Sequence, residues 1–320
     1  MDNPINLIIG PTGSIGMATA RSLLEMNQNT RFFGRNINKI RKFYPDNDQF
    51  KTFIGGITEI AALEKAAEGV THIYYCLNVP YHQWYQKAVP FLKTCLKVAA
   101  KQKAKVIFPG NVYVYGHAQR NPVDETHPHQ THTRKGNIRI KMEQQLANMH
   151  QEFGNDYVIV RMPDFYGPYV INGFSENFYL NALRHKPLNW PGDLHIPTEM
   201  IFIEDAGKAM TTAGLSNQGA NTDYNIPGYQ EITVRKYLEM IRHYANSNSK
   251  ISSTNSSIMI TLAGLFNQTV REYKEMMYLK TERLLLSGEK YQKTFGALPT
   301  TTYDLGIQKT LNWTREFYKL

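Results

Sequence analysis

Short aliphatic runs alternate with longer amphipathic segments along the first half of this chain. The run Ile5–Ile9 lacks a regular alternation of apolar and polar residues, which is typical of a strand buried on both faces of a parallel sheet. In residues 17–26 the apolar positions recur about one helical turn apart, which predicts a helix against a core. The same succession then repeats, and it predicts an α/β fold with a doubly wound parallel sheet. The further strands predicted are residues 30–33, 50–54, 72–76, 105–109 and 157–161.

The repeating pattern loosens after the last of these strands. Four prolines divide the next stretch into short pieces: Pro168, Pro187, Pro191 and Pro197. Helical periodicity then dominates the C-terminal third. We therefore predict two domains: residues 1–168 with 201–228 carry the sheet, and residues 169–200 with 229–320 form a smaller, mostly helical domain. The C-terminal helices predicted are residues 233–244, 257–266, 270–278 and 307–317.

The composition is that of a globular protein, since 42% of the 320 residues are hydrophobic and 20% are charged. Cys76 and Cys95 fall in a predicted strand and a predicted helix, which favours a reduced, cytoplasmic setting over a disulfide framework. The chain enters its first strand without the basic region of a signal peptide. The longest apolar candidate for a membrane span, residues 258–266, falls well short of the roughly 20 residues that a bilayer requires. We therefore expect a protein that does not enter a membrane.

The net charge of +9 favours an anionic partner, which is either a nucleic acid or a small anionic ligand. The densest basic run spaces four lysines by four residues, as on one solvated helix face: Lys93, Lys97, Lys101 and Lys105. No stacking aromatic residues interleave it, so we expect no specific nucleic-acid binding.

Three histidines lie close together in a polar stretch: His127, His129 and His132. Asp124 and Glu125 are the only acids beside them, and no cysteine completes a ligand set. Histidines of a solvated loop explain the pattern better than a metal site, so no metal is predicted.

Three glycines separate the first strand from the first helix: Gly10, Gly13 and Gly16. Without side chains, such a turn lets a pyrophosphate reach the backbone N–H groups at the positive end of the helix, here those around Ile15. Thr12 and Ser14 add hydroxyl donors. The alternative is an ordinary βα turn that uses glycine for its dihedral angles. The position, one strand from the start and opening a helix, predicts a dinucleotide-binding Rossmann domain.

The end of the second predicted strand bears on the choice of coenzyme. NAD-selective folds place an Asp or Glu there to bind the ribose 2′-hydroxyl. This chain has Gly34 and Arg35 instead. The guanidinium of Arg35 suits a 2′-phosphate, although a surface arginine at a loop is the simpler alternative. The sequence therefore predicts NADP, with NAD as the less favoured coenzyme.

Five motifs stand in order along the chain: GPTGSIG at 10–16, VYG at 114–116, a helix lysine at Lys141, RMPDFYGP at 161–168 and FIED at 202–205. With them the chain resembles the extended short-chain dehydrogenase/reductases and, within these, the NAD-dependent epimerase/dehydratase family. The resemblance spans nearly all of the chain. It implies a homodimer through a four-helix bundle and further coenzyme contacts from Leu77 and Pro163.

The catalytic positions of that family are substituted, which makes this an atypical member. The family carries a Ser or Thr five residues before the glycine of VYG and a Tyr four residues before the helix lysine. Here these places hold Asn111 and Asn137, while Lys141 is retained. Because an amide does not exchange a proton at neutral pH, the usual acid or base is missing.

Two nearby residues are candidates for the missing chemistry. Tyr113 lies three residues before Gly116, where sugar dehydratases of the family place a catalytic acid, and we expect it to donate the proton. A core aromatic residue is the alternative for Tyr113. Asp164 matches a position that lines the substrate pocket in relatives, and a carboxylate there favours substrate hydroxyls or an amine over a nucleotide sugar. Gly56 replaces the aspartate that binds adenine in the family, which weakens adenine recognition.

These observations predict a redox enzyme that binds NADP and acts on a small carbonyl, polyol or sugar-type substrate. The alternative is a catalytically inactive sensor of NADP(H) that has lost turnover with Asn111 and Asn137.

Overall fold

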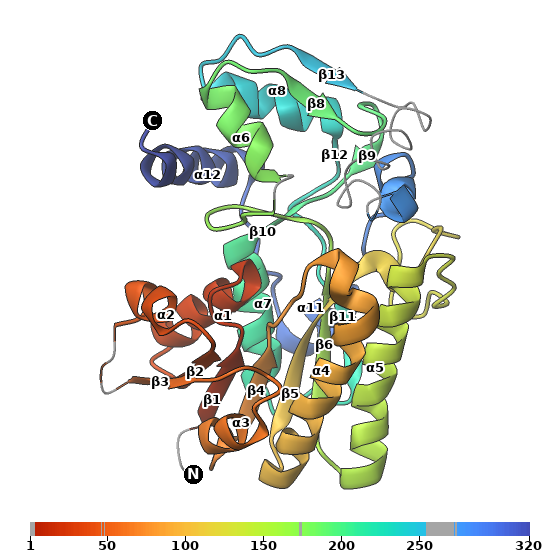
Figure 1. Cartoon of the computed structure of the whole chain (residues 1–320). Coiled ribbons are helices and arrows are strands. Elements are labelled where there is room, and N and C mark those ends of the chain that lie inside the picture. The colour runs from red at the N-terminus through yellow and green to blue at the C-terminus, as the bar shows by residue number, and fades with distance from the viewer. Residues whose placement is uncertain (1–3, 46, 48, 173–174, 254–271, 273) are drawn as a thin grey trace.

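The computed structural model describes residues 4–45, 47, 49–172, 175–253, 272 and 274–320. It confirms the α/β class: seven parallel strands form one sheet in the order β11-β6-β5-β4-β1-β2-β3 (Figure 1). The strands are β1 (Ile5–Ile9), β2 (Asn29–Gly34), β3 (Phe50–Ile54), β4 (His72–Tyr75), β5 (Lys105–Asn111), β6 (Tyr157–Met162) and β11 (Thr222–Asn225).

Helices cover both faces of this sheet. One face packs against α3 (Ile60–Ala67), α4 (Tyr81–Gln102) and α5 (Arg134–Phe153). The other face packs against α1 (Ser14–Glu25), α2 (Ile37–Phe43) and α7 (Ile203–Leu215). Successive strand side chains point to opposite faces, so Leu7 belongs to the first core and Ile8 to the second. Two cores on one sheet explain why its strands are almost continuously apolar.

The strand order reverses between β1 and β4, which pair directly, with Leu7 opposite Ile73. On its other side β1 pairs with β2, with Leu7 opposite Arg31. Helices that leave two neighbouring strands in opposite directions open a crevice at the carboxyl ends of those strands. The turn after β1 therefore lies where open α/β sheets bind their ligands.

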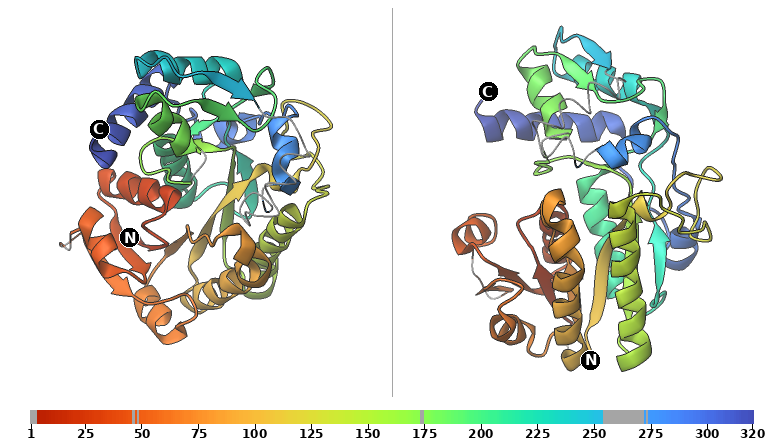
Figure 2. Two further views of the ribbon diagram at one scale, coloured as in Figure 1. Left: turned by 45° about the horizontal axis from the view of Figure 1, so that its top comes forward. Right: turned by 45° about the vertical axis from the view of Figure 1, so that its right-hand side comes forward.

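A smaller lobe lies beyond the carboxyl ends of the strands (Figures 1 and 2). Its own core gathers buried side chains from distant segments, such as Tyr237, Leu238 and Ile307. Its helices and main strand pair are α6 (Ser175–Leu183), α8 (Val234–Tyr244), α12 (Tyr303–Tyr318), β8 (Leu188–Trp190) and β13 (Ile251–Ser253). The shorter pairs are β7 (Phe165–Tyr166) with β10 (Ile201–Phe202) and β9 (Pro197–Thr198) with β12 (Ile232–Thr233).

The C-terminal third is largely helical, with two differences from the prediction. Residues 274–280 form a 3-10 helix, η2 (Lys274–Lys280), and the helix predicted at 257–266 lies outside the described residues. In addition, α11 (Glu289–Phe295) packs on β11, and Tyr291 joins the core under α1 and α7. The sequence predicted that α11 belongs to the smaller domain. In the structure its Tyr291 and Phe295 pack against Tyr224 of the edge strand β11.

Both cysteines, Cys76 and Cys95, are buried free thiols, and burial raises the pKa of Cys76 to about 12. Within the described part of the chain, no helix combines the length and the apolar character needed to cross a bilayer.

Candidate active site

Two glycines of the turn after β1 lie so close to backbone atoms that no residue with a side chain fits in their place. Gly10 has a φ of +84°, and a Cβ there would lie 2.9 Å from the backbone of Leu77. A Cβ on Gly16 would lie 2.2 Å from the carbonyl oxygen of Gly10. Leu77 thus contacts the turn through its main chain, directly after β4.

Gly13 differs from its two neighbours because its Cβ would meet no atom closer than 3.6 Å. It is exposed and is the N-cap residue of α1, whose first turn has no side-chain cap and no acidic residue. The first N–H groups of α1, around Ser14 and Ile15, have no partner within the helix, and the space beside Gly13 is open. Thr12 is half-buried beside them, and the Ser14 hydroxyl donates to the carbonyl oxygen of Tyr169 at 3.0 Å. This cradle fits the pyrophosphate of a dinucleotide.

Two side chains lie over Gly56, at the end of β3. The Gly56 N–H donates to Oε1 of Glu59 at 3.0 Å, and a Cβ on Gly56 would lie 3.0 Å from that same oxygen. The stem of Arg35, which is exposed just after β2, lies 3.9 Å from the same Cβ position. A carboxylate is thus present beside Gly56, although Gly56 stands where the family has an aspartate. Glu59, three residues further along, contributes it.

The carboxyl end of β5 carries a pair of tyrosine hydroxyls. Asn111 ends the strand and caps the 3-10 helix η1 (Val112–Val114) that follows. Its Oδ1 accepts from the N–H of Tyr113 at 3.2 Å. Tyr113 is buried, and its hydroxyl lies 2.7 Å from that of Tyr81 at the start of α4. The structure thus brings Asn111 and Tyr113 together at the strand ends.

The structure does not place Asn137 and Lys141 with them. Both side chains are exposed on the outer face of α5, and Asn137 Nδ2 donates to the backbone oxygen of Thr133. The side of α5 that packs on the sheet instead carries the buried residues Ile138 and Met142. We therefore correct the prediction that Asn137 and Lys141 form the site pair, because helix geometry directs them to solvent.

Two other residues with the same spacing of four point inward from α5. Lys135 is buried, and its Nζ donates to Glu275 Oε1 at 2.5 Å and to Glu272 Oε2 at 2.8 Å. The same nitrogen lies 5.2 Å from the ring centre of Tyr81, so Lys135 lies beside the tyrosine pair.

Arg139 lies one turn further along the buried side of α5. Its guanidinium lies 4.6 Å from the ring centre of Phe108 and donates to the carbonyl oxygen of Pro109. Burial lowers the pKa of this group. Lys135 and Arg139 were detectable from the sequence, because they continue the face of Ile138 and Met142.

Asp164 lies two residues beyond β6, next to the half-buried Pro163. Its Oδ2 lies 2.6 Å from Nζ of Lys280, at the end of η2. The Asp164 backbone oxygen also accepts from the N–H of Ile201 at 3.1 Å. Asp164 thus lies at the carboxyl edge of the sheet, with an ion-pair partner that local sequence does not reveal, and its role in a substrate pocket stays a prediction.

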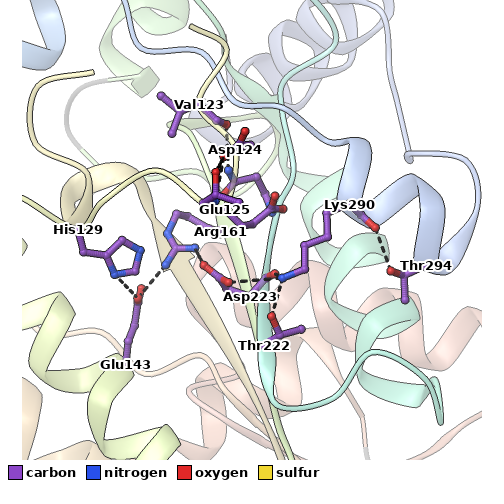
Figure 3. Close-up of polar contacts among 12 residues, drawn as sticks. Val123, Asp124, Glu125, His129, Glu143, Arg161, Thr222, Asp223, Lys290 and Thr294 are labelled. Atoms are coloured by element: carbon purple, nitrogen blue, oxygen red, sulfur yellow. Dashed lines mark hydrogen bonds and ion pairs between the residues drawn. The ribbon is translucent and has the colours of Figure 1, made fainter. Parts of the chain in front are cut away.

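A buried charge network stabilises the β6 side of this edge (Figure 3). Arg161 of β6 is completely buried and lies 2.7 Å from Glu143 Oε2 and 2.6 Å from Asp223 Oδ2. Lys290 of α11 donates to the Asp223 backbone oxygen at 2.8 Å. The network joins β6, β11 and α5, although Arg161 Nε and Glu143 Oε1 have no hydrogen-bond partner among the described residues.

The histidines of the polar loop have separate structural environments. His127 is buried, and its Nε2 accepts from the N–H of Gln119 at 3.0 Å. Burial, followed by the charge of Arg161, lowers the pKa of His129 to about 4. His132 stacks on His117 with ring centres 4.1 Å apart. The described residues contain no group of three or more His, Cys, Asp or Glu side chains placed to hold a metal ion.

A sequence model described as the NAD dependent epimerase/dehydratase family matches residues 6–227. The chain belongs to this family. As a member of the epimerase/dehydratase family it carries the glycine turn in the expected place. Motif spacing predicts Asn111 and Asn137 in place of the Ser/Thr and Tyr of relatives, and this substitution stays a prediction for Asn111 alone.

Individual relatives of this family member are distant. The dTDP-glucose 4,6-dehydratase of Neisseria meningitidis serogroup B is 25% identical over 171 residues, which are 50% of this chain and 43% of that protein. The chain thus spans less than half the length of the curated dehydratases that it matches.

Solved structures of the family share the fold along the whole chain. The dTDP-glucose 4,6-dehydratase of Bacillus anthracis in complex with NAD has a TM-score of 0.81 at 17% identity and covers 99% of this chain and 98% of its own. The UDP-glucuronic acid 4-epimerase of Bacillus cereus in complex with NAD has a TM-score of 0.82 at 16% identity and covers 98% of this chain and 99% of its own.

Proposed function

We propose that this chain is an NADP(H)-dependent oxidoreductase that acts on a small carbonyl, polyol or sugar-type substrate. The observation that supports it is that the bare main-chain cradle around Gly13 and the hydroxyl pair of Tyr113 and Tyr81 occupy the same edge of one sheet. A bound coenzyme supplies hydride transfer at its nicotinamide C4. The relatives are named as dehydratases and epimerases of nucleotide sugars. Nucleotide sugars are therefore the second candidate substrate class.

Tyr113 is the proposed proton donor to the substrate oxygen. Its hydroxyl is 2.7 Å from the Tyr81 hydroxyl, within the reach that proton transfer requires. The cap from Asn111 holds the backbone of Tyr113 in η1. In this proposal Asn111 is a positioning residue, and the half-buried Tyr81 relays a proton from solvent to Tyr113 after each cycle.

Lys135 is the proposed cation of the site, in place of Lys141. It points inward from the first turn of α5 and lies beside Tyr81. A positive charge there stabilises negative charge on a neighbouring tyrosine oxygen. Arg139, one turn further, adds a second buried cation behind the strand end.

Arg35 and Glu59 are the proposed contacts at the adenosine end of the coenzyme. The exposed guanidinium of Arg35 suits a ribose 2′-phosphate, with room provided by Gly34. The carboxylate of Glu59, beside Gly56, can accept from the adenine amino group. Thr12, Gly13, Ser14 and Ile15 would contact the pyrophosphate, and Leu77 and Pro163 would line the path towards the nicotinamide.

Calorimetric titration with NADPH and NADH tests the coenzyme. We expect NADPH to bind more tightly, and Arg35→Leu to lose about tenfold in NADPH affinity, since hydrogen bonds to charged groups contribute about 1.5–3 kcal/mol. NADH affinity should stay unchanged in this variant. A carbonyl panel followed at the nicotinamide absorbance then tests turnover, which Tyr113→Phe should abolish. Failure of both coenzymes to bind would overturn the proposal.

A sensor of NADP(H) without turnover is the second candidate. The observation that favours it is that two carboxylates already hold the ammonium of Lys135. Tight NADPH binding with no oxidation across a broad carbonyl panel would select the sensor.

We further propose a homodimer, as the resemblance implies, built on the two longest described helices, α4 and α5. These helices pack side by side on one face of the sheet. Their exposed residues include Lys93, Lys97 and Lys141, which a twofold axis would bring towards their copies. Dimerisation should therefore strengthen as salt screens the repulsion. A chain that sediments as a monomer at low and high salt would contradict this.

A further inference from the structure

The ion pair of Asp164 and Lys280 joins the two lobes above the end of β6. The distance from Asp164 Oδ2 to Lys280 Nζ is 2.6 Å, and the lysine side chain is 13% exposed against 49% for the carboxylate. Lys280 is held on its other side by the smaller lobe: its Nζ lies 5.0 Å from the ring centre of Trp190, and its backbone oxygen accepts from the N–H of Asp193 at 3.0 Å. The ammonium is thus fixed in place, while the carboxylate is the part open to solvent.

A second lysine beside the strand ends is also bound by carboxylates of this chain. Lys135 is bound by Glu272 and Glu275, and Glu275 belongs to the same 3-10 helix as Lys280. An anionic substrate would therefore have to displace a carboxylate of this chain from either lysine. A neutral substrate meets no such competitor, and the exposed carboxylate of Asp164 can accept hydrogen bonds from its hydroxyl groups.

We propose that the Asp164–Lys280 pair is a specificity determinant that excludes nucleotide diphosphates and favours an uncharged, hydroxyl-bearing substrate. This inference rests on the oxidoreductase function proposed above, and it separates this chain from relatives whose names specify nucleotide sugars. The physical basis is twofold: the pair cancels the cation that a diphosphate needs, and it presents a like charge to the incoming phosphate groups.

The test measures binding of UDP-glucose, dTDP-glucose and UDP to the full chain by calorimetry, with NADPH present. We expect the wild type to show no saturable binding up to millimolar ligand. Asp164→Asn keeps the shape but removes the carboxylate charge beside the Lys280 ammonium, so the affinity of the variant should rise about tenfold or more for each ligand that contains a diphosphate. The double variant Asp164→Asn with Lys280→Met should lose this gain.

Glu64→Gln is the matched control for net charge. It releases Lys101 in the last turn of α4, at the opposite end of the strands, and alters the charge by the same amount. It should leave nucleotide-sugar binding unchanged. Saturable micromolar binding by the wild type, or no gain in a folded Asp164→Asn protein that still binds NADPH, would overturn the inference. Loss of NADPH binding by the wild type is a separate result, because it would refute the proposed function itself.

Discussion

The first βα turn and the region beyond β6 lie at the same edge of the sheet, but they are built from different parts of the chain. The turn is main chain: Gly10 and Gly16 are pressed against backbone atoms, and Gly13 leaves the helix N-terminus open. The other region consists of side-chain pairs between distant segments: Asp164 and Lys280 are 116 positions apart, and Lys135 and Glu275 are 140 positions apart. A main-chain site tolerates sequence change around its glycines, whereas a side-chain site changes its chemistry with each substitution. We therefore expect the glycine turn to vary less among relatives than the side chains beyond β6.

We expect the largest difference between two alanine substitutions within the glycine turn, one of which should destabilise the fold and the other only weaken coenzyme binding. Gly16→Ala places a Cβ 2.2 Å from a carbonyl oxygen, so we expect a loss of about 3 kcal/mol or more in the free energy of unfolding. Gly13→Ala meets no atom closer than 3.6 Å and should fold normally, yet it should lose coenzyme binding because its methyl group occupies the cradle. Urea unfolding and NADPH titration of both variants check this. Normal NADPH affinity in Gly13→Ala would show that the cradle is not the binding site.

On the side-chain region, Glu143→Gln should cost about 3 kcal/mol, because breaking a buried ion pair leaves a charge poorly compensated. Among the described residues, Arg161 would then keep Asp223 as its one ion-pair partner. Asp164→Asn provides the contrast, since half-exposed pairs contribute about 1 kcal/mol or less. Urea unfolding of the two variants measures the difference. Equal losses of unfolding free energy would contradict the view that the Arg161–Glu143 pair stabilises the fold and the Asp164–Lys280 pair does not.

Lys135→Met and Lys141→Met distinguish the inward face of α5 from its outward face. We expect Lys135→Met to lower turnover of any substrate found in the carbonyl panel about 100-fold, a typical loss for a group that assists proton transfer. Lys141 is exposed, and its variant should behave as wild type. If the two losses were reversed, the motif-based assignment of Lys141 would stand and Lys135 would be structural.

The smallest effect concerns a buried carboxyl that connects the lobe to the segment after η2. Burial raises the pKa of Glu199 to about 8 from 4.5, although the N–H groups of Leu286 and Gly228 partly oppose this. The folded protein then holds a proton that the unfolded chain releases, so stability falls as pH rises between these values. Between pH 6 and pH 8 the wild type should lose about 1–2 kcal/mol more than Glu199→Gln. Parallel pH profiles in urea unfolding would disprove the shift.

Much of the fold was predictable because its signals are local. The run Ile5–Ile9 is β1 as predicted, and the glycine turn leads into α1. The helix α5 was also predictable, but its inward face was assigned from motif spacing instead of from Ile138 and Met142. Motif spacing indicates Asn137 and Lys141, whereas the hydrophobic face of the helix indicates Lys135 and Arg139, and these two are the buried pair.

The amino-acid sequence by itself determined the doubly wound sheet and the turn that opens it, because hydrophobic periodicity and glycine spacing act over a few residues. The tertiary structure alone decided which charges meet. Lys280 pairs with Asp164, and Glu272 and Glu275 pair with Lys135. These contacts exist because the smaller lobe lies over the strand ends. No local pattern encodes such a meeting, since it depends on closing a loop of more than one hundred residues.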